Sequence, residues 1–422
     1  MRRDEQGMKN YVIIGNGAAA AGCIEGIRAA DKTGKITVIS KEQHPVYCRP
    51  LISYYLEGKT TLERMHYRAP DFYEKNGCRV LYGVEATALN PNEKTVTLSN
   101  GEQLLYSEVC VATGSSPFVP PMKGLETVLQ KFNFLTVDDA LALEEAVTKT
   151  SRVLIVGAGL IGLKCAEGLK NRVQSVTVCD LADRVLSSIL DAPAAAFMQK
   201  HLEQNGLTFL LNNSVEQFSG NTARFTGGQT LEFDQLVLAV GVRPNVGLVK
   251  NAGGSCGRGI TVNSAMQTSL PFVFAAGDCT ESTDISDNTV KIMALMPNAY
   301  MQGFCAGSNM AGKAAGFQNA IPMNAIGFFG LHAMTAGSRP GPEQGGKVYT
   351  EQDEKHIKKL YSKNGLLTGF ILIGQTERAG IYTSLIRNKI PLNSVDYEAL
   401  KKAPNLFAFG QEYRRNKLGG VV

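Results

Sequence analysis

The sequence predicts an α/β fold with two Rossmann-like domains and a small α+β domain at the C-terminal end. Near the N-terminus, an apolar strand, a glycine-rich turn, a helix and a second strand follow one another, and the same order recurs further along the chain. The final part of the chain instead alternates between apolar and polar positions around a turn. With 422 residues, 44% of them hydrophobic and 19% charged, the chain is long enough for two or three domains.

The first unit begins with the apolar run at 11–14, which is typical of a parallel strand buried on both faces. The turn that follows has the pattern GxGxxA, formed by Gly15, Gly17 and Ala20, and it leads into an alanine-rich helix and a strand at 35–39. Gly15 allows the tight turn, Gly17 lets the backbone approach a pyrophosphate, and Ala20 lets the helix pack on the strand. Because the helix begins at this turn, the unit is expected to bind a dinucleotide.

The second unit has the same order. An apolar strand at 152–156 runs into the turn GxGxxG, formed by Gly157, Gly159 and Gly162, and a helix and a strand at 175–179 follow. The two turns begin 142 residues apart (157 minus 15). Two dinucleotide-binding units in one chain are most simply interpreted as sites for a bound flavin dinucleotide and a visiting nicotinamide dinucleotide.

Asp180 ends the second strand of this repeat, 18 residues after Gly162 (180 minus 162). A carboxylate at this place can accept both hydrogen bonds of an adenosine ribose, as the dinucleotide fingerprint requires. The same charge would repel a 2′-phosphate, so the sequence favours NADH over NADPH.

Composition excludes several other classes of protein. The net charge of +5 is too small and too dispersed for a nucleic-acid-binding protein. None of the nine cysteines forms a CxxC or CxxxxC pair, which indicates a reducing cytoplasm rather than a disulfide framework. The five scattered histidines predict no metal site, and no apolar run is long enough to predict a membrane span.

Further segments carry a family resemblance. Apolar strands lead into the segments 112–114 (ATG) and 241–245 (GVRPN), a predicted strand at 268–278 ends in Gly-Asp, and 296–299 (MPNA) begins a helix. In this order the segments resemble the pyridine nucleotide–disulfide oxidoreductase family of flavoproteins, which has a glutathione-reductase-like fold. The stretch 42–51 (EQHPVYCRPL) is similar to the branch that contains NADH:rubredoxin and ferredoxin reductases.

The resemblance covers about residues 10–315 and implies a domain organisation. An FAD-binding domain is expected at 10–117 and 246–320, an NAD-binding domain at 118–245 and an interface domain at 321–422. In the family the last domain contacts a second subunit or shields the flavin, which implies a homodimer as one arrangement.

The resemblance also implies roles for single residues. Glu42 would hold the adenosine ribose of FAD, although the strand-end position itself is Ser40, and Arg49 would neutralise the phosphates. The start of the helix at Asn298 would face the flavin ring. The full set of implied FAD contacts is Gly15, Gly17, Ala20, Glu42, Arg49, Thr113, Gly114, Asp278, Asn298 and Ala299. The implied NADH contacts are Gly157, Gly159, Ile161, Gly162, Asp180 and Gly241.

Cys48 departs from the disulfide reductases of the family, which need two cysteines spaced CxxxxC beside the flavin. The positions five residues away on either side are Gln43 and Ser53, so chemistry of that type is excluded. A redox-active Cys48, as in NADH oxidases and peroxidases, stays an alternative to a small core residue beside the cofactor.

A second departure concerns the predicted catalytic residues, Lys164 and Tyr54. Ferredoxin-reductase relatives carry a glutamate where this chain has Lys164 and a lysine where it has Tyr54. One hypothesis is that Lys164 points at flavin N5 and stabilises negative charge after the hydride arrives, with Tyr54 packed alongside. The alternative is a lysine turned to solvent that pairs with Glu167.

The C-terminal part is expected to form a small α+β domain. Asn364-Gly365 between alternating runs predicts a hairpin whose second strand is 366–373, and helical periodicity follows at 379–390. The end of the chain is basic, which indicates either a solvated tail or a docking patch for an acidic iron–sulfur protein. Its basic residues are Lys401, Lys402, Arg414, Arg415 and Lys417.

Together these observations predict a cytoplasmic FAD enzyme that passes electrons between NADH and a rubredoxin- or ferredoxin-like iron–sulfur carrier. The alternatives are an NADH oxidase or peroxidase that uses Cys48, and a flavin electron-relay subunit of a larger complex.

Overall fold

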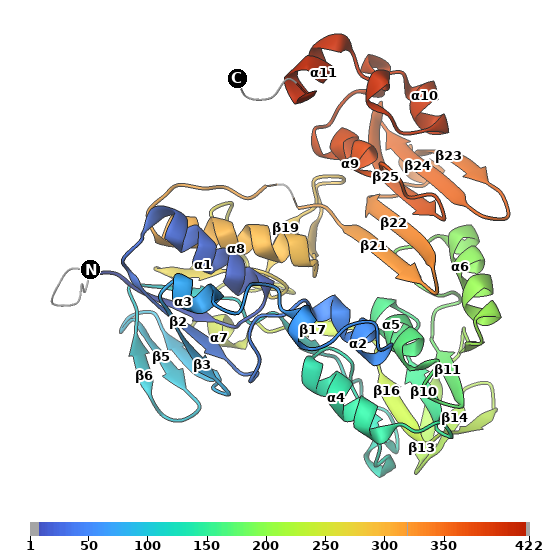
Figure 1. The fold of residues 1–422 in the computed structure, drawn as a ribbon, viewed down its shortest axis with the longest axis horizontal. Coiled ribbons are helices and arrows are strands. Elements are labelled where there is room, and N and C mark those ends of the chain that lie inside the picture. Colours follow the sequence, from blue (N-terminus) through green and yellow to red (C-terminus); the bar gives the residue numbers. More distant parts are fainter. Residues whose placement is uncertain (1–7, 319, 419–422) are drawn as a thin grey trace. The chain divides into compact units, whose positions relative to one another are not determined.

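The computed structural model describes residues 8–318 and 320–418, with side chains up to residue 415 (Figure 1). The described residues form two compact units. The first contains the described residues up to 184 together with 206–282 and 291–318; the second contains 185–205, 283–290 and the described residues from 320 onward. The second unit therefore takes in 185–205, which precede the C-terminal part by more than a hundred residues. The predicted domain boundaries stay predictions.

The first unit contains a five-stranded parallel sheet with the order β18-β7-β1-β2-β3. The predicted strands at 11–14 and 35–39 are both confirmed, and they pair in parallel. The side chains of β1 between 11 and 14 are at most 3% exposed, as expected for a strand covered on both faces. The strands are β1 (Asn10–Ile14), β2 (Lys35–Ser40), β3 (Cys78–Tyr82), β7 (Glu108–Val111) and β18 (Val273–Ala275).

Two helices pack side by side against this sheet, α1 (Ala18–Ala30) and α8 (Met296–Met310) (Figure 1). Glycines allow their close approach: a Cβ atom on Gly22 would lie 2.2 Å from the carbonyl oxygen of Tyr300, and one on Gly303 would lie 1.9 Å from that of Ala19. The two helices start at the same end of the sheet. Their close contacts at Gly22 and Gly303 fix the position of each helix along the other, because tightly packed backbones cannot shift without clashing.

The predicted strand at 268–278 is wrong in length, since β18 covers only Val273–Ala275. Phe272 has a φ of +63°, which an extended strand does not allow. The hydroxyl of Thr268 accepts from the Leu270 N–H at 3.1 Å and donates to the Val273 oxygen at 2.9 Å, so this segment forms a turn.

A second parallel sheet in the same unit has the order β12-β11-β10-β16-β9. It confirms the predicted strands at 152–156 and 175–179, and the apolar strand expected before the segment 241–245 ends at Leu238. Its strands are β9 (Lys131–Phe132), β10 (Arg152–Val156), β11 (Ser175–Cys179), β12 (Thr208–Leu210) and β16 (Gln235–Leu238). The helices α5 (Leu160–Leu169) and α4 (Val137–Ala146) accompany this sheet.

Short elements complete the first unit. Two three-stranded antiparallel sheets are built from β4 (Ala86–Asn90), β5 (Thr95–Leu98) and β6 (Gln103–Leu105), and from β13 (Val215–Ser219), β14 (Thr222–Phe225) and β15 (Thr230–Glu232). Strands β8 (Ser115–Pro117) and β17 (Val242–Pro244) pair antiparallel where the chain passes between the two parallel sheets. The remaining helices are α2 (Ile52–Leu56), α3 (Phe72–Lys75) and α7 (Gly247–Asn251). Two short strands, β19 (Glu281–Thr283) and β20 (Val290–Ile292), follow β18 in the chain.

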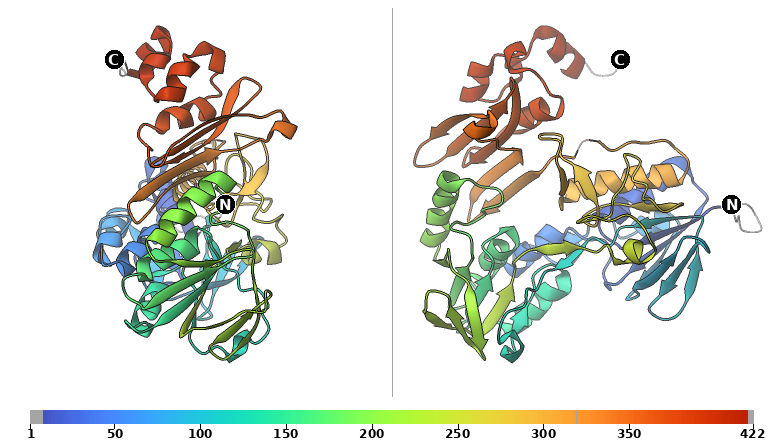
Figure 2. Two further views of the ribbon diagram at one scale, coloured as in Figure 1. Left: turned by 90° about the vertical axis from the view of Figure 1, so that its right-hand side faces the viewer. Right: turned by 180° about the vertical axis from the view of Figure 1, so that it is seen from behind.

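The second unit contains a five-stranded antiparallel sheet with the order β21-β22-β25-β24-β23, seen from two further sides in Figure 2. Its strands are β21 (Met323–Phe328), β22 (Leu331–Gly337), β23 (Lys347–Gln352), β24 (Ile357–Lys363) and β25 (Leu366–Ile373), and its helices are α6 (Ala192–Gln204), α9 (Gly380–Arg387), α10 (Tyr397–Lys402) and α11 (Gln411–Leu418). The predicted hairpin is confirmed. Asn364 and Gly365 both have positive φ, +53° and +73°, as a two-residue hairpin turn requires.

The cysteines, the metal-ligating side chains and the helices of the described residues can be compared with what composition predicted. All nine cysteines are free thiols. No group of three or more metal-ligating side chains comes together in the described part of the chain. None of the helices within the described ranges is long and apolar enough to cross a membrane.

Candidate functional site

The first glycine turn leaves an open space in front of α1. Gly15 has a φ of +115°, and a Cβ atom there would lie 2.1 Å from the carbonyl oxygen of Ala112, so only glycine fits. Gly17 is the residue before α1, and a Cβ atom at that position would have no heavy atom within 4 Å. Ala20 is fully buried in the helix. The free N–H groups at the helix start and the empty space before them suit a pyrophosphate.

The second glycine turn has the same geometry. Gly157 has a φ of +118°, and a Cβ atom on it would lie 2.3 Å from the oxygen of Ala239. Gly159 precedes α5 and, like Gly17, would carry a Cβ atom with no neighbour within 4 Å. A Cβ atom on Gly162 would lie 1.9 Å from the oxygen of Gly157, so this glycine is needed for the helix to meet the turn. Ile161 is half-buried on the same helix.

Asp180 lies beside this second turn. One carboxylate oxygen accepts from the N–H of Ala158 at 2.6 Å, and the other accepts from the N–H of Ala182 at 2.8 Å. Each oxygen keeps a second lone pair, so the carboxylate is oriented at the end of β11 and can still accept from a diol. Gly241, with a φ of +109° and open space at its Cβ position, lies just before β17.

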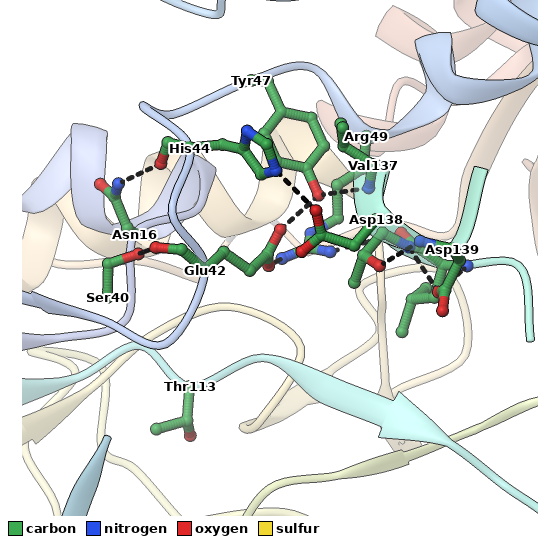
Figure 3. Close-up of polar contacts among 12 residues, drawn as sticks. Asn16, Ser40, Glu42, His44, Tyr47, Arg49, Thr113, Val137, Asp138 and Asp139 are labelled. Carbon is green, nitrogen blue, oxygen red and sulfur yellow. Dashed lines mark hydrogen bonds and ion pairs between the residues drawn. The ribbon is translucent and has the colours of Figure 1, made fainter. Parts of the chain in front are cut away.

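Glu42, Tyr47 and Arg49 form a cluster next to the first sheet (Figure 3). The hydroxyl of Tyr47 donates to Glu42 Oε2 at 2.6 Å, and Arg49 forms an ion pair with Glu42 Oε1. The Arg49 guanidinium also lies over the Tyr47 ring, 5.3 Å from its centroid. The hydroxyl of Ser40 donates to the backbone oxygen of Glu42 at 2.7 Å. Thus the strand-end serine shapes the loop that places Glu42, the predicted ribose ligand.

The same loop contacts the start of α4. Thr136 caps that helix in a capping box with Asp139. The Val137 N–H donates to the Tyr47 hydroxyl at 3.1 Å. His44 Nε2 lies 2.7 Å from the Asp138 carboxylate (Figure 3). Residues predicted for the FAD side and the helix that leads into the second sheet are thus joined by side-chain contacts.

Thr113 and Gly114 follow β7 and are held by Asn245. The Thr113 hydroxyl donates to the Asn245 backbone oxygen at 2.9 Å, and the Asn245 side-chain amide donates to the Thr113 oxygen at 2.8 Å. The Asn245 N–H donates to the Gly114 oxygen at 3.0 Å. Gly114 has a φ of +64° and open space at its Cβ position. The segment predicted to line the flavin is therefore fixed by reciprocal hydrogen bonds.

Asp278 follows the end of β18. Burial raises the pKa of its carboxyl group, and the positive charge of Arg49 partly offsets that increase. No group among the described residues donates a hydrogen bond to this carboxylate, which leaves it available to a ligand. The turn before it is held by Gln302, whose side-chain oxygen accepts from the Gly277 N–H at 2.7 Å.

The start of α8 carries Asn298 and Ala299, which are 3% and 7% exposed. Cys48 lies beside this helix start, with its sulfur 3.8 Å from that of Met296. Burial raises the pKa of the Cys48 thiol. A redox-active cysteine usually has a lowered pKa, so this environment disfavours a thiolate and favours the role of a small packed residue.

Lys164 and Tyr54 come together, as predicted. The Lys164 ammonium lies 5.0 Å from the centroid of the Tyr54 ring. It also lies 2.6 Å from the Glu167 carboxylate, so the pairing named as an alternative is present. The lysine is nevertheless not turned to solvent, because its side chain is only 18% exposed and that of Glu167 only 5%. The Lys164 ammonium on α5 and the Tyr54 ring on α2 are therefore both partly buried.

The basic residues near the C-terminus do not all present free charge. The Lys401 ammonium lies 2.5 Å from the Glu398 carboxylate, which cancels one positive charge of the predicted patch. Arg414 lies over the ring of Phe407, 5.6 Å from its centroid. The side chain of Lys417 lies outside the described part of the chain.

Sequence reasoning missed Tyr47, Asn245 and Gln302 as residues that hold the site together. Tyr47 and Asn245 lie inside segments that carried the family resemblance, and Gln302 lies in the helix that the segment 296–299 begins; that was the available signal. Their roles depend on contacts between elements far apart in the sequence, which a single sequence does not reveal.

Comparisons with known proteins identify the family of this chain and several relatives. The family model described as pyridine nucleotide-disulphide oxidoreductase matches residues 9–303. The relative named NADH-dependent phenylglyoxylate dehydrogenase subunit epsilon, from Aromatoleum evansii, is 32% identical over 394 residues, covering 90% of this chain and 92% of the relative. NADH oxidase from Methanocaldococcus jannaschii is 31% identical over 394 residues, covering 86% of this chain and 87% of that protein.

NADH-rubredoxin oxidoreductase from Clostridium acetobutylicum is 26% identical over 357 residues, covering 85% of this chain and 89% of the relative. A crystal structure of NADH:rubredoxin oxidoreductase from that organism has the same fold, with a TM-score of 0.73 at 24% identity, and the match covers 90% of this chain and 95% of the other. The predicted fold class of two Rossmann-like domains and a small α+β domain is confirmed.

Proposed function

Because the chain belongs to the pyridine nucleotide-disulphide oxidoreductase family, we propose that it transfers electrons between NADH and a small iron–sulfur carrier through a bound FAD. One observation carries the proposal: two glycine turns, each with open space at the start of a helix, occur in one compact unit. The residues present fit both cofactors, since each turn can receive a pyrophosphate.

When bound, FAD supplies a ring that accepts a hydride from NADH and releases electrons one at a time to a carrier. The chain supplies binding and orientation. Gly17 and the start of α1 would hold one pyrophosphate, with Glu42 on the adenosine ribose and Arg49 beside the phosphates. Asp278 and the Thr113–Gly114 segment would contact the flavin side, and the start of α8 would direct its positive end at the ring.

The visiting nucleotide would bind at the second turn. Gly159 and the start of α5 would receive the NADH pyrophosphate, and Asp180 would accept the ribose hydroxyls. Because the Asp180 carboxylate is negative, a 2′-phosphate would be repelled, so NADH is preferred over NADPH. Lys164, held by Glu167 and the Tyr54 ring, would place a positive charge near the reacting edge of the flavin.

The environment of Cys48 favours an iron–sulfur carrier, rather than oxygen or peroxide, as the electron acceptor. Its thiol has a raised pKa and lies in a methionine-lined contact, and no second cysteine is spaced for a disulfide. The relative named NADH-rubredoxin oxidoreductase supports a rubredoxin-like acceptor. The relative named NADH oxidase keeps direct oxygen use as the competing outcome of the test below.

A second candidate role is a flavin electron-relay subunit of a larger complex. It is favoured by the relative named as a subunit of phenylglyoxylate dehydrogenase, which matches this chain over nearly its whole length. The two roles share the same cofactors and differ only in whether the acceptor is a diffusing carrier or a bound partner subunit.

Two further features are proposed, a subunit interface and a cellular compartment. The 321–422 domain would form a homodimer interface, because it exposes the apolar side chains of Val348 (50%) and Phe407 (84%). The nine free thiols fit a reducing compartment, which we take to be the cytoplasm.

The test is anaerobic reduction of the purified protein by NADH and by NADPH, followed by reoxidation with rubredoxin, with ferredoxin or with air. The expected result is faster reduction by NADH and faster reoxidation by one of the iron–sulfur carriers than by air. Rapid reoxidation by air that Cys48→Ser abolishes would support the oxidase instead. Reduction without reoxidation by any carrier would support the subunit role.

A further inference from the structure

We infer that Tyr47 is a positioning residue for the adenylate half of FAD: it holds the Glu42 carboxylate and the Arg49 guanidinium in the orientation in which they meet the cofactor. The inference rests on the proposed function, because it takes FAD as the ligand of the first glycine turn.

Tyr47 contacts three groups at once. Its side chain is buried, and its hydroxyl donates to Glu42 Oε2 at 2.6 Å and accepts from the Val137 N–H at 3.1 Å (Figure 3). Its ring lies beneath the Arg49 guanidinium. One side chain, itself fixed to the start of α4, therefore holds both Glu42, the residue predicted for the adenosine ribose, and Arg49, the residue predicted for the phosphates.

The direction of these hydrogen bonds follows from the protonation state. Burial raises the pKa of the Tyr47 hydroxyl far above neutral pH, so the group stays protonated. Its single proton goes to Glu42, and its lone pair receives the Val137 N–H. Glu42 thus accepts from Tyr47 and from Arg49, which leaves lone pairs on both oxygens for the hydroxyls of a ribose.

The anchor at α4 is what makes Tyr47 a positioning residue rather than another ligand. The capped N-terminus of α4 is rigid, since the Thr136–Asp139 capping box satisfies its first donors. Arg49 Nη1 also donates to the Leu135 oxygen, at 3.3 Å. Without the Tyr47 hydroxyl, Glu42 would stay paired with Arg49, which keeps its own bond to Leu135, but Glu42 would lose its link to the Val137 N–H at the start of the helix.

This arrangement predicts an effect confined to one half of the cofactor. Thr113, Gly114 and the start of α8 are held by other contacts, so binding of the flavin ring should not depend on Tyr47. FMN carries the flavin ring without the adenosine. The ratio of the FMN and FAD dissociation constants therefore measures the contribution of Tyr47, whereas general damage to the fold would weaken the binding of FAD and FMN equally.

The experiment is titration of apoprotein with FAD and with FMN, followed by flavin fluorescence, for the wild type and Tyr47→Phe. Phenylalanine keeps the ring and removes the hydroxyl. We expect the dissociation constant of FAD to rise about tenfold, as for the loss of one hydrogen bond to a charged group, and that of FMN to change less than twofold.

The matched control is Tyr361→Phe. Tyr361 is similarly buried, at 7% exposed against 8%, and its hydroxyl donates to the Asp191 carboxylate at 2.8 Å in the second unit. This variant should leave both dissociation constants unchanged.

A second variant keeps the inference open to refutation if Tyr47→Phe fails to fold. Val137→Pro removes the N–H that donates to Tyr47 at the first helical position, where proline is well accepted. It should lower the preference for FAD over FMN about threefold. An unchanged preference in whichever variant folds, or an equal loss for FAD and FMN, would overturn the inference. Wild-type protein that binds no FAD would instead refute the proposed function.

Discussion

Gly159→Ala separates the fold of the second glycine turn from its proposed binding of NADH. Gly159 has a φ of −81° and a ψ of −174°, which any residue adopts, and a Cβ atom there would meet no heavy atom within 4 Å. The free energy of unfolding should therefore change by no more than about 1 kcal/mol, because alanine is a poorer N-cap but orders the unfolded chain.

The effect on NADH should be much larger. The methyl group would occupy the space through which a pyrophosphate approaches the N–H groups at the start of α5. Loss of two hydrogen bonds to a charged phosphate, at about 1.5 kcal/mol each, amounts to about 3 kcal/mol. Since each 1.4 kcal/mol is a factor of ten, the KM for NADH should rise roughly a hundredfold. The value of kcat should change little, because the reacting atoms lie at the other end of the nucleotide.

The assay is steady-state reduction of ferricyanide at varied NADH, combined with a thermal melt. Gly162→Ala is the control for damage to the fold, since its Cβ atom would lie 1.9 Å from the Gly157 oxygen, and it should lower the melting temperature. If Gly159→Ala keeps both the wild-type KM and the wild-type melting temperature, the open space is not the NADH site.

Two other changes test parts of the site, and a third tests the stability of the fold at Asp31, the C-cap of α1. Lys164→Ala removes the ammonium 2.6 Å from the buried Glu167 carboxylate, so it should cost about 3 kcal/mol in urea unfolding and slow flavin reduction in stopped flow at least about tenfold; a normal reduction rate would exclude a role for Lys164 in that step. Cys48→Ser should leave carrier-dependent turnover within about twofold of the wild type, because its thiol is not activated; abolished turnover would show that Cys48 is redox-active. Burial alone would raise the pKa of Asp31, but hydrogen bonds to its carboxylate lower it from an ordinary 3.8 to about 2. The ionised carboxylate therefore stabilises the folded protein above about pH 4, and this stabilisation is lost as the pH falls toward 2. Asp31→Asn should therefore flatten that part of the acid-unfolding curve, and an unchanged curve would contradict the assignment.

Local patterns were enough to predict the parts of the fold that depend on them. The strands at 11–14, 35–39, 152–156 and 175–179 are apolar runs that match buried parallel strands, and their positions are confirmed. The hairpin at Asn364-Gly365 was predictable because only a few residue types accept two successive positive φ angles.

Features that depend on contacts between distant segments were not predictable. The predicted strand at 268–278 overran because Phe272 adopts a left-handed conformation that its residue type does not indicate. Residues 185–205 belong to the second unit, where the Asp191 carboxylate contacts Lys359 and Tyr361 more than 160 residues away.

The candidate site shows the same division. The glycine positions were predicted from the needs of a tight turn and a close phosphate; the structure gives Gly15 and Gly157 positive φ angles and leaves open space at Gly17 and Gly159, and their binding roles stay predictions. The i,i+3 spacing allowed the Lys164–Glu167 pair to be named in advance. The bonds of Tyr47 to Glu42 and Val137 could not be named, because residue 137 lies 90 positions away and carries no signal of its own.

The most direct test is an anaerobic titration of the purified holoprotein with NADH, with the released flavin measured after denaturation. We expect one FAD per chain and complete loss of the yellow flavin absorbance at one equivalent of NADH. A colourless protein that takes up no added FAD, or a bound flavin that NADH does not bleach, would contradict the proposal that the two glycine turns bring the two cofactors together.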